Sequence, residues 1–200
     1  MGNVKELAQQ CNLAFDFIQK LYLEVSYFIK EVEGLLLEEN FTIGRPSGYQ
    51  ISARSSSGLE PINVNMWLLR KMGVFFAPQD EIKFERGQTS LDVTKPAKVI
   101  YLRILLNDKT IEGPVVYAGV LHNILKKPKS KWIQKFEQAM QHIEYNDEKI
   151  FRGNLKQISH EDNHISFKGN LNTVNLFEIN DSETIQNKIT EPCLKLYKQY

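Results

Sequence analysis

The chain has 200 residues, of which 42% are hydrophobic, and its formal net charge at pH 7 is +1. This balance is typical of a globular chain that can bury one sizeable core. The sequence has no apolar run approaching about 18 residues, and no basic segment leads into an apolar one with a small-residue cleavage site. We therefore expect neither a membrane-spanning segment nor secretion, and we predict a cytoplasmic protein.

The two cysteines predict free thiols rather than a disulfide. Cys11 and Cys193 both fall on apolar helical spacings, which predicts buried positions for both. Free thiols are typical of a reducing compartment, and two cysteines are too few for a cysteine-based metal site. The cysteine pattern therefore agrees with a cytoplasmic location.

Apolar residues recur at alternating three- and four-residue spacing across the first forty positions. They fill every a and d position of five heptads: Val4, Leu7, Cys11, Ala14, Ile18, Leu21, Val25, Phe28, Val32 and Leu35. The e positions are also apolar or aromatic: Ala8, Phe15, Tyr22, Ile29 and Leu36. This pattern predicts one long amphipathic helix over residues 1–38, with Asn3 as its N-cap and Glu6 completing a capping box.

A helix of this length must either span the body of the protein or project from it. From Val4 to Leu35 it would measure about 48 Å at about 1.5 Å per residue, whereas a domain of this size has a radius of gyration of only about 16 Å. The wide a/d/e face favours packing on a sheet or a bundle core. A projecting end would instead present the face to a partner, and both interpretations hold if one end overhangs. The candidate interface residues are Ile18, Leu21, Val25 and Phe28.

Residues 41–125 alternate β-branched and aromatic runs with turn signals, which predicts a sheet-rich segment. The elements expected before its centre are a hairpin over 41–51, a short helix over 66–72 ended by Gly73, and strands over 74–76, 81–85 and 90–94. The two longest runs, 99–106 and 115–125, should pair antiparallel because the connection between them is short. Gly119 inside the second run predicts a bulge or a close backbone approach.

Residues 130–200 predict a helix, a hairpin and a closing helix. The expected elements are a helix capped by Ser130 with Trp132, Phe136, Met140 and Ile143 on one stripe, hairpin strands over 151–159 and 165–167, a strand over 174–179, and a last helix capped by Asp181 or Ser182 and kinked near Pro192. The element order predicts one α+β domain over residues 1–200. Its sheet should be mainly antiparallel, with the long N-terminal helix and further helices packed against it.

Charge is distributed unevenly along the chain. Residues 1–40 carry a net charge of −4, residues 41–135 of +8 and residues 136–200 of −3. The candidate anion-binding or nucleic-acid-binding residues are Arg45, Arg54, Lys126, Lys127, Lys129 and Lys131, beside Lys135 and Trp132. Such a basic surface predicts weak, salt-dependent binding of nucleic acid or another anion. The alternatives are a solvated lysine-rich loop, with Trp132 anchoring the helix that follows to the core, and mutual neutralisation of the three segments.

Two further groups of residues could carry metal chemistry. Asp80 and Glu81 with Lys83 resemble in kind the carboxylates and lysine of a metal-dependent nuclease, although such charges are also typical of an edge strand. His160 and His164 bracket a turn with Glu161 and Asp162, while His122 and His142 lie elsewhere in the sequence. The hairpin tip should be exposed and His122 should be a hydrogen-bonded core residue, so we predict no metal site and no cofactor.

No acid, base or nucleophile assembles from these patterns. We therefore expect a non-enzymatic binding or assembly module that associates with itself or with a protein partner through the N-terminal helix. A basic surface for nucleic acid would be a second property. The alternative is a metal-dependent nuclease or nucleotide-processing enzyme that uses Asp80, Glu81 and Lys83.

Overall fold

A computed structural model describes residues 2–43, 70–85, 88–107 and 112–200. Its centre is an antiparallel sheet with strand order β1-β2-β5-β6-β8-β7. These strands are β1 (Phe41–Ile43), β2 (Lys71–Pro78), β5 (Ala97–Leu105), β6 (Val115–Lys126), β7 (Ile158–Glu161) and β8 (Ile165–Asn175). A separate two-stranded sheet pairs β3 (Lys83–Glu85) with β4 (Gln88–Ser90). The expected α+β fold with a mainly antiparallel sheet is confirmed.

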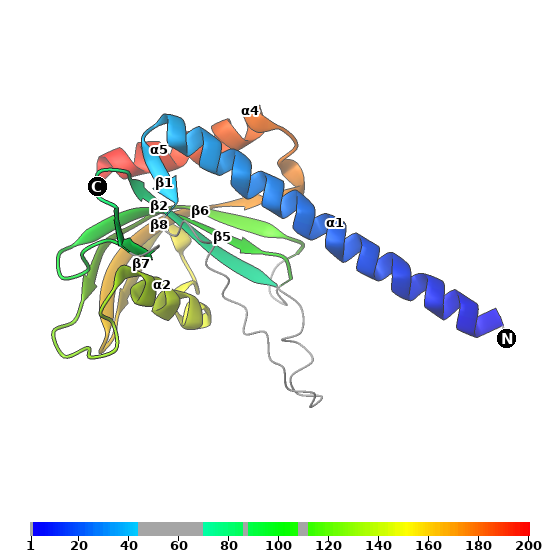
Figure 1. Ribbon diagram of the computed structural model, residues 1–200, viewed down its shortest axis with the longest axis horizontal. Coiled ribbons are helices and arrows are strands. Elements are labelled where there is room, and N and C mark those ends of the chain that lie inside the picture. The colour runs from blue at the N-terminus through cyan, green and yellow to red at the C-terminus, as the bar shows by residue number, and fades with distance from the viewer. Residues whose placement is uncertain (1, 44–69, 86–87, 108–111) are drawn as a thin grey trace.

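Helices cover both faces of the large sheet (Figure 1). The helical elements are α1 (Gly2–Glu38), α2 (Phe136–Tyr145), α3 (Asp147–Ile150), η2 (Leu155–Gln157), η3 (Leu176–Glu178), α4 (Ser182–Ile185), η4 (Gln186–Thr190) and α5 (Glu191–Gln199). One apolar cluster joins α1, α4 and α5 to one face of the sheet, and another joins α2 to the other face. Strands β5 and β6 are buried on both faces, which explains their almost continuous apolar runs.

The central strands pair as expected. β5 and β6 are antiparallel, with Tyr101 opposite Gly119. A Cβ atom on Gly119 would collide with the carbonyl oxygen of Asn170 on β8, so the glycine marks a close backbone approach. The pairing of β6 with β8 is irregular farther along β6, between His122 and Leu125.

Helix α1 divides into two parts with different surroundings. Its C-terminal half packs on the sheet through buried side chains: Val25, Phe28, Ile29, Val32 and Leu36. Its N-terminal part, residues 3–20 (the arm), extends away from the body of the protein (Figure 1). The sequence left open whether the helix is an internal spine or a projection. The C-terminal half is an internal spine, and the N-terminal part is a projection. The helix already includes Gly2, so Asn3 is not its cap.

In the first half of the chain, the end of one predicted helix is part of a strand. Met72 and Gly73 belong to β2, where they pair with Ile104 and Arg103. The prediction that a helix ends at Gly73 is therefore wrong. Short apolar runs fit a buried strand as well as a helix, which explains this error. The expected hairpin turn and the start of that helix lie outside the described residues.

The helix expected at Ser130 begins at Phe136 instead. Ser130 caps a local turn by accepting a hydrogen bond from the backbone N–H of Ile133. The helix start is fixed by Gln138, whose side-chain oxygen accepts from the backbone N–H groups of Gln134 and Lys135. Trp132 consequently lies outside the helix and is 42% exposed, so it does not anchor the helix in the core.

The C-terminal hairpin is shorter at its start and longer at its end than expected. Gly153 has a positive φ, and Asn154 caps η2, so the first strand begins only at Ile158. Strand β8 continues to Asn175, whose side chain then caps η3 in place of the separate strand expected over 174–179. Asp181 caps α4 as expected, accepting from the backbone N–H of Thr184.

The last helix changes geometry before Pro192. A π-helical stretch, Gln186–Thr190, separates α4 from α5, and the proline lies at the start of α5. Proline cannot donate a backbone hydrogen bond to the preceding turn, which accounts for the interruption predicted there.

Candidate functional site

The arm of α1 leaves large apolar side chains in contact with solvent. Five of them are 57–73% exposed: Val4, Leu7, Leu13, Phe15 and Phe17. Cys11 is exposed as well, so the expectation that both cysteines are buried holds only for Cys193. Isolated apolar residues on a surface need no explanation. Val4, Leu7 and Phe15 belong to the a/d/e seam and Phe17 lies at the adjacent g position, so these four form one exposed apolar face.

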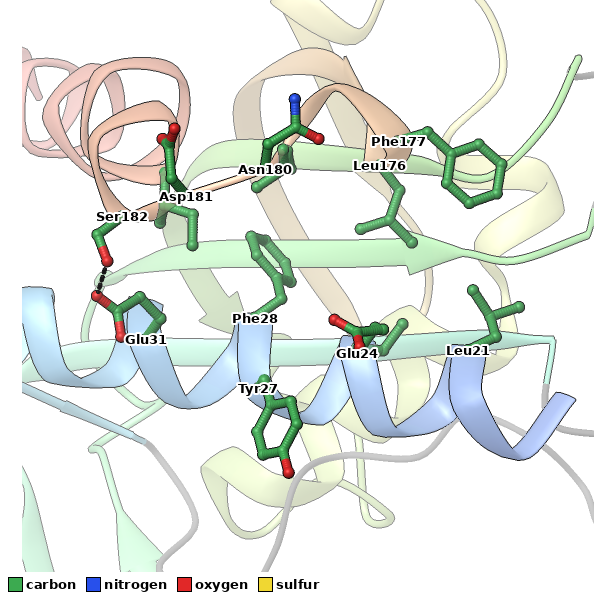
Figure 2. Close-up of a pocket in the computed structure, with 13 residues that line it drawn as sticks. Leu21, Glu24, Tyr27, Phe28, Glu31, Leu176, Phe177, Asn180, Asp181 and Ser182 are labelled. Atoms are coloured by element: carbon green, nitrogen blue, oxygen red, sulfur yellow. Dashed lines mark hydrogen bonds between the residues drawn. The ribbon is translucent and has the colours of Figure 1, made fainter. Parts of the chain in front are cut away.

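A groove of about 400 Å³ lies where the arm joins the body of the protein. Leu21, Glu24 and Phe28 of α1 point toward the segment 176–182, which forms the opposite wall (Figure 2). Ser182 Oγ donates a hydrogen bond to Glu31 Oε1 at 2.6 Å and closes one end of the groove. The groove therefore continues the exposed seam of the arm into the body.

The four predicted interface residues separate into two pairs. Val25 is 2% exposed and Phe28 is 6% exposed, because both pack on the sheet. Ile18 and Leu21 are only partly buried and lie on the arm or at its base. Only the second pair is accessible to a partner. The exposed residues nearer the N-terminus extend the surface beyond the four candidates.

The predicted basic surface is only partly described. Arg45 and Arg54 lie outside the described residues. Lys127 forms an ion pair with Glu161, which offsets its charge. Lys126 is half-buried, whereas Lys129 and Lys131 are exposed. The anion-binding surface therefore stays a prediction.

The carboxylates proposed for a nuclease centre lie in a turn. Asp80 and Glu81 are exposed after β2, and Lys83 lies in β3. Burial raises the pKa of Tyr197, and the charges of Glu81 and Asp80 raise it further. Among the described residues, neither carboxylate belongs to a set of three metal-ligating side chains.

A different set of potential ligands gathers between α2 and the β7–β8 hairpin. His142, His160 and Asp162 offer ligand atoms that all lie within 4.8 Å of one another. Asp162 Oδ2 is 2.6 Å from His142 Nε2 and 3.1 Å from His160 Nε2. The ring of His164 lies beside that of His142, with centroids 5.2 Å apart. Sequence reasoning noticed the hairpin but missed His142, because no local pattern indicates that α2 crosses there.

Hydrogen bonds set the charge of Asp162. Partial burial alone would raise the pKa of its carboxyl group. Hydrogen bonds from His142, from the backbone of His164 and Ile165, and from His160 outweigh that effect and hold the pKa well below its usual range. The group is therefore a carboxylate at neutral pH.

The fourth histidine, His122, lies apart from this cluster. It is half-buried and stacks on Tyr200 with ring centroids 3.9 Å apart.

A second polar cluster lies inside the core between the sheet and α2. Arg103 and Glu144 are each 3% exposed, and Arg103 Nη1 is 3.1 Å from Glu144 Oε2. The Tyr101 hydroxyl donates to the other oxygen of Glu144. Burial and then the Glu144 charge raise the pKa of Tyr101 well above its ordinary value. Phe151 stacks on Tyr101 and also contacts the Arg103 guanidinium, so we assign the cluster to fold stability.

None of the helices in the described part of the chain has the length and apolar character needed to cross a bilayer. No known protein family, curated protein or solved structure matches the chain.

Proposed function

We propose that this protein is a non-enzymatic assembly module that pairs with a second copy of itself through the arm of α1. The observation that carries the proposal is the continuity of one apolar seam. Between Val25 and Leu36 the seam is buried against the sheet, and from Val4 to Ile18 the same seam is largely exposed. The exposed continuation of a face that is elsewhere buried supports an interface along the arm.

An unpaired arm is also poorly stabilised as a helix. Isolated helices gain little stability in water, and most helical stability in proteins comes from packing of the apolar face. Burial of a side chain such as Val4 or Leu7 contributes about 1.5–3 kcal/mol relative to full exposure. Pairing would therefore stabilise both the arm and the complex.

Charge favours a second copy over an unrelated partner. The arm carries two lysines and two carboxylates, so its net charge is zero and a second copy is not repelled. Partner choice in helical pairs is usually set by charges at the e and g positions. In the arm these positions hold uncharged residues: Asn3, Ala8, Gln10, Phe15 and Phe17. The polar face also lacks the concentration of lysine and arginine typical of membrane-surface helices.

The seam is complementary to itself when the two arms run antiparallel. With the centre of the pair between Asn12 and Leu13, Val4 faces Leu21, Leu7 faces Ile18 and Cys11 faces Ala14 of the other copy. The two smallest seam residues then meet at the centre, and larger residues meet on both sides. Interdigitation of this kind is what a paired helical seam requires.

The position of the body of the protein also favours the antiparallel arrangement. Because the sheet covers the seam from Val25 onward, a parallel pair would place two bodies on the same face at the same end. In the antiparallel pair the bodies lie at opposite ends. The N-terminal end of each arm then stops at Leu21 of the other copy, beside the groove of Figure 2.

The cytoplasmic location belongs to the same proposal. Cys11 is a free, exposed thiol near the centre of the proposed pair. Exposed free thiols persist in compartments that keep cysteines reduced. The exposed thiol of the unpaired chain therefore supports a cytoplasmic location as part of the proposal.

Charges introduced into the exposed seam should abolish pairing without unfolding the protein. In a variant with Leu7→Asp and Ala14→Asp, each carboxylate would face an apolar residue of the other copy. We expect sedimentation over about 1–100 µM protein to give a dimer for the wild type and a monomer for this variant. Its monomer stability should change by no more than about 1 kcal/mol, because both sites are exposed.

A matched control adds the same charge to the same segment. Asn12→Asp with Gln19→Asp places two carboxylates at exposed b positions outside the seam. This control should keep the wild-type mass. A wild-type protein that stays monomeric up to about 100 µM, or equal masses for both double variants, would contradict the proposal.

A further inference from the structure

We propose that His142, His160 and Asp162 form a binding site for a divalent transition-metal ion of the zinc class. Two imidazole nitrogens and one carboxylate oxygen already converge, with Nε2 of each histidine 2.6 Å and 3.1 Å from Asp162 Oδ2. An ion bound by all three atoms would need only small side-chain shifts, since metal–ligand distances to such atoms are about 2.0–2.2 Å.

The carboxylate is fixed by its own hairpin. Asp162 Oδ1 accepts hydrogen bonds from the backbone N–H of His164 at 2.7 Å and of Ile165 at 2.9 Å. These two bonds leave Oδ2 directed at the histidines. Hydrogen-bonded support of this kind orients a ligand before the metal arrives and is a common feature of protein metal sites.

The two histidines are held by different elements. His142 lies in the last turn of α2, where Asn146 donates its side-chain N–H to the His142 carbonyl oxygen. His160 lies in β7, and its ring packs on that of Phe167 with the ring centroids 5.3 Å apart. Ligands from a helix, a strand and a turn are thus brought together by the fold, and they do not depend on one mobile loop.

The surroundings bury the site only in part. The side chains of His142, His160 and Asp162 are 12%, 17% and 29% exposed. The ring of Trp132 lies beside that of His142, with the ring centroids 5.4 Å apart. Three protein ligands would leave at least one coordination position for water or another small ligand, as in open zinc sites.

The ligand chemistry favours a transition metal over magnesium or calcium. Imidazole suits zinc, cobalt, nickel, copper and iron, whereas magnesium and calcium prefer sites built from oxygen atoms. A mixed set of two imidazoles and one carboxylate therefore predicts selectivity for the first group.

The site is independent of the proposed pairing surface. α2 lies on one face of the large sheet, and α1 lies on the other (Figure 1). Loss of metal binding should therefore leave the oligomeric state unchanged, and loss of pairing should leave metal binding unchanged.

Calorimetric titration of the purified full-length chain with Zn²⁺, Co²⁺ and Mg²⁺ tests the proposal. We expect one saturable site per chain for Zn²⁺ and Co²⁺, and no competition from Mg²⁺. At a free Zn²⁺ concentration about 100-fold above the dissociation constant, the melting temperature should rise by roughly 5–10 °C. Absence of saturable Zn²⁺ binding, or displacement of Zn²⁺ by an equal concentration of Mg²⁺, would overturn it.

Substitutions locate the site. His142→Gln, His160→Gln and Asp162→Asn should each weaken Zn²⁺ affinity by about 100-fold or more, the upper end of what loss of a supporting residue costs. Asp162→Asn keeps an oxygen that can accept the two backbone hydrogen bonds, so the hairpin should survive. His122→Gln is the matched control, because His122 stacks on Tyr200 away from the cluster. Wild-type affinity in His142→Gln or Asp162→Asn, or an equal loss in His122→Gln, would overturn the assignment.

Discussion

Glu144→Ala should lower the free energy of unfolding by about 3–5 kcal/mol. The substitution removes the carboxylate that lies 3.1 Å from the Arg103 guanidinium, and both side chains are only 3% exposed. It also removes the acceptor of the buried Tyr101 hydroxyl. Desolvated charged and polar groups that lose such an interaction are among the most destabilising features that a single substitution can create.

Chemical denaturation of the wild type and of two variants measures this effect. The double variant Arg103→Met with Glu144→Leu removes both charges together and should recover most of the lost stability, since buried ion pairs can often be replaced by apolar residues. A loss below about 1 kcal/mol in Glu144→Ala would show that water reaches the cluster. The close packing of Glu144 against Gly73 argues against that outcome.

Val32→Asp should destabilise the protein by about 4 kcal/mol or more, enough to unfold much of a marginally stable population. Val32 is fully buried where α1 packs on the sheet. A carboxylate there would lose its hydration without gaining a counter-charge. The same change at Leu7, on the same seam but in the exposed arm, should leave the monomer folded.

Circular dichroism during denaturation separates the two substitutions. We expect Val32→Asp to lose cooperative unfolding or to shift its midpoint strongly, and Leu7→Asp to stay within about 1 kcal/mol of the wild type when both are monomeric. Equal losses at the two positions would contradict the division of α1 into a packed half and a projecting arm.

The heptad pattern predicted α1 almost completely, but it could not predict where the body of the protein ends. Its a, d and e residues are equally apolar from Val4 to Leu36, and such a face can pack on a sheet or on another helix. Only tertiary structure decides between them. The buried part begins near Val25, where the sheet and the C-terminal helices meet the seam.

Central strands were predictable because their β-branched runs are long and separated by clear turns. The predicted boundaries of elements were wrong where capping side chains set the true ones, as with Gln138 at the start of α2 and Asn175 at the end of β8. The polar clusters could not be predicted at all. Glu144 and His142 sit two residues apart on α2, yet one is buried on Arg103 and the other faces Asp162. Helical periodicity places the two side chains on different faces of α2, with Glu144 on the buried face, but it does not indicate the partners that each one meets.

Distances between spin labels on paired arms test the central claim most directly. With Cys11→Ala as background, single labels at positions 5, 12 and 19 all occupy b positions of the heptad. In the antiparallel pair, equivalent labels should be closest at position 12 and about 20 Å farther apart along the helix axis at positions 5 and 19, given about 1.5 Å per residue. A short distance at all three positions would show a parallel pair, and absence of dipolar coupling at every position would show that the arm does not bind a second copy.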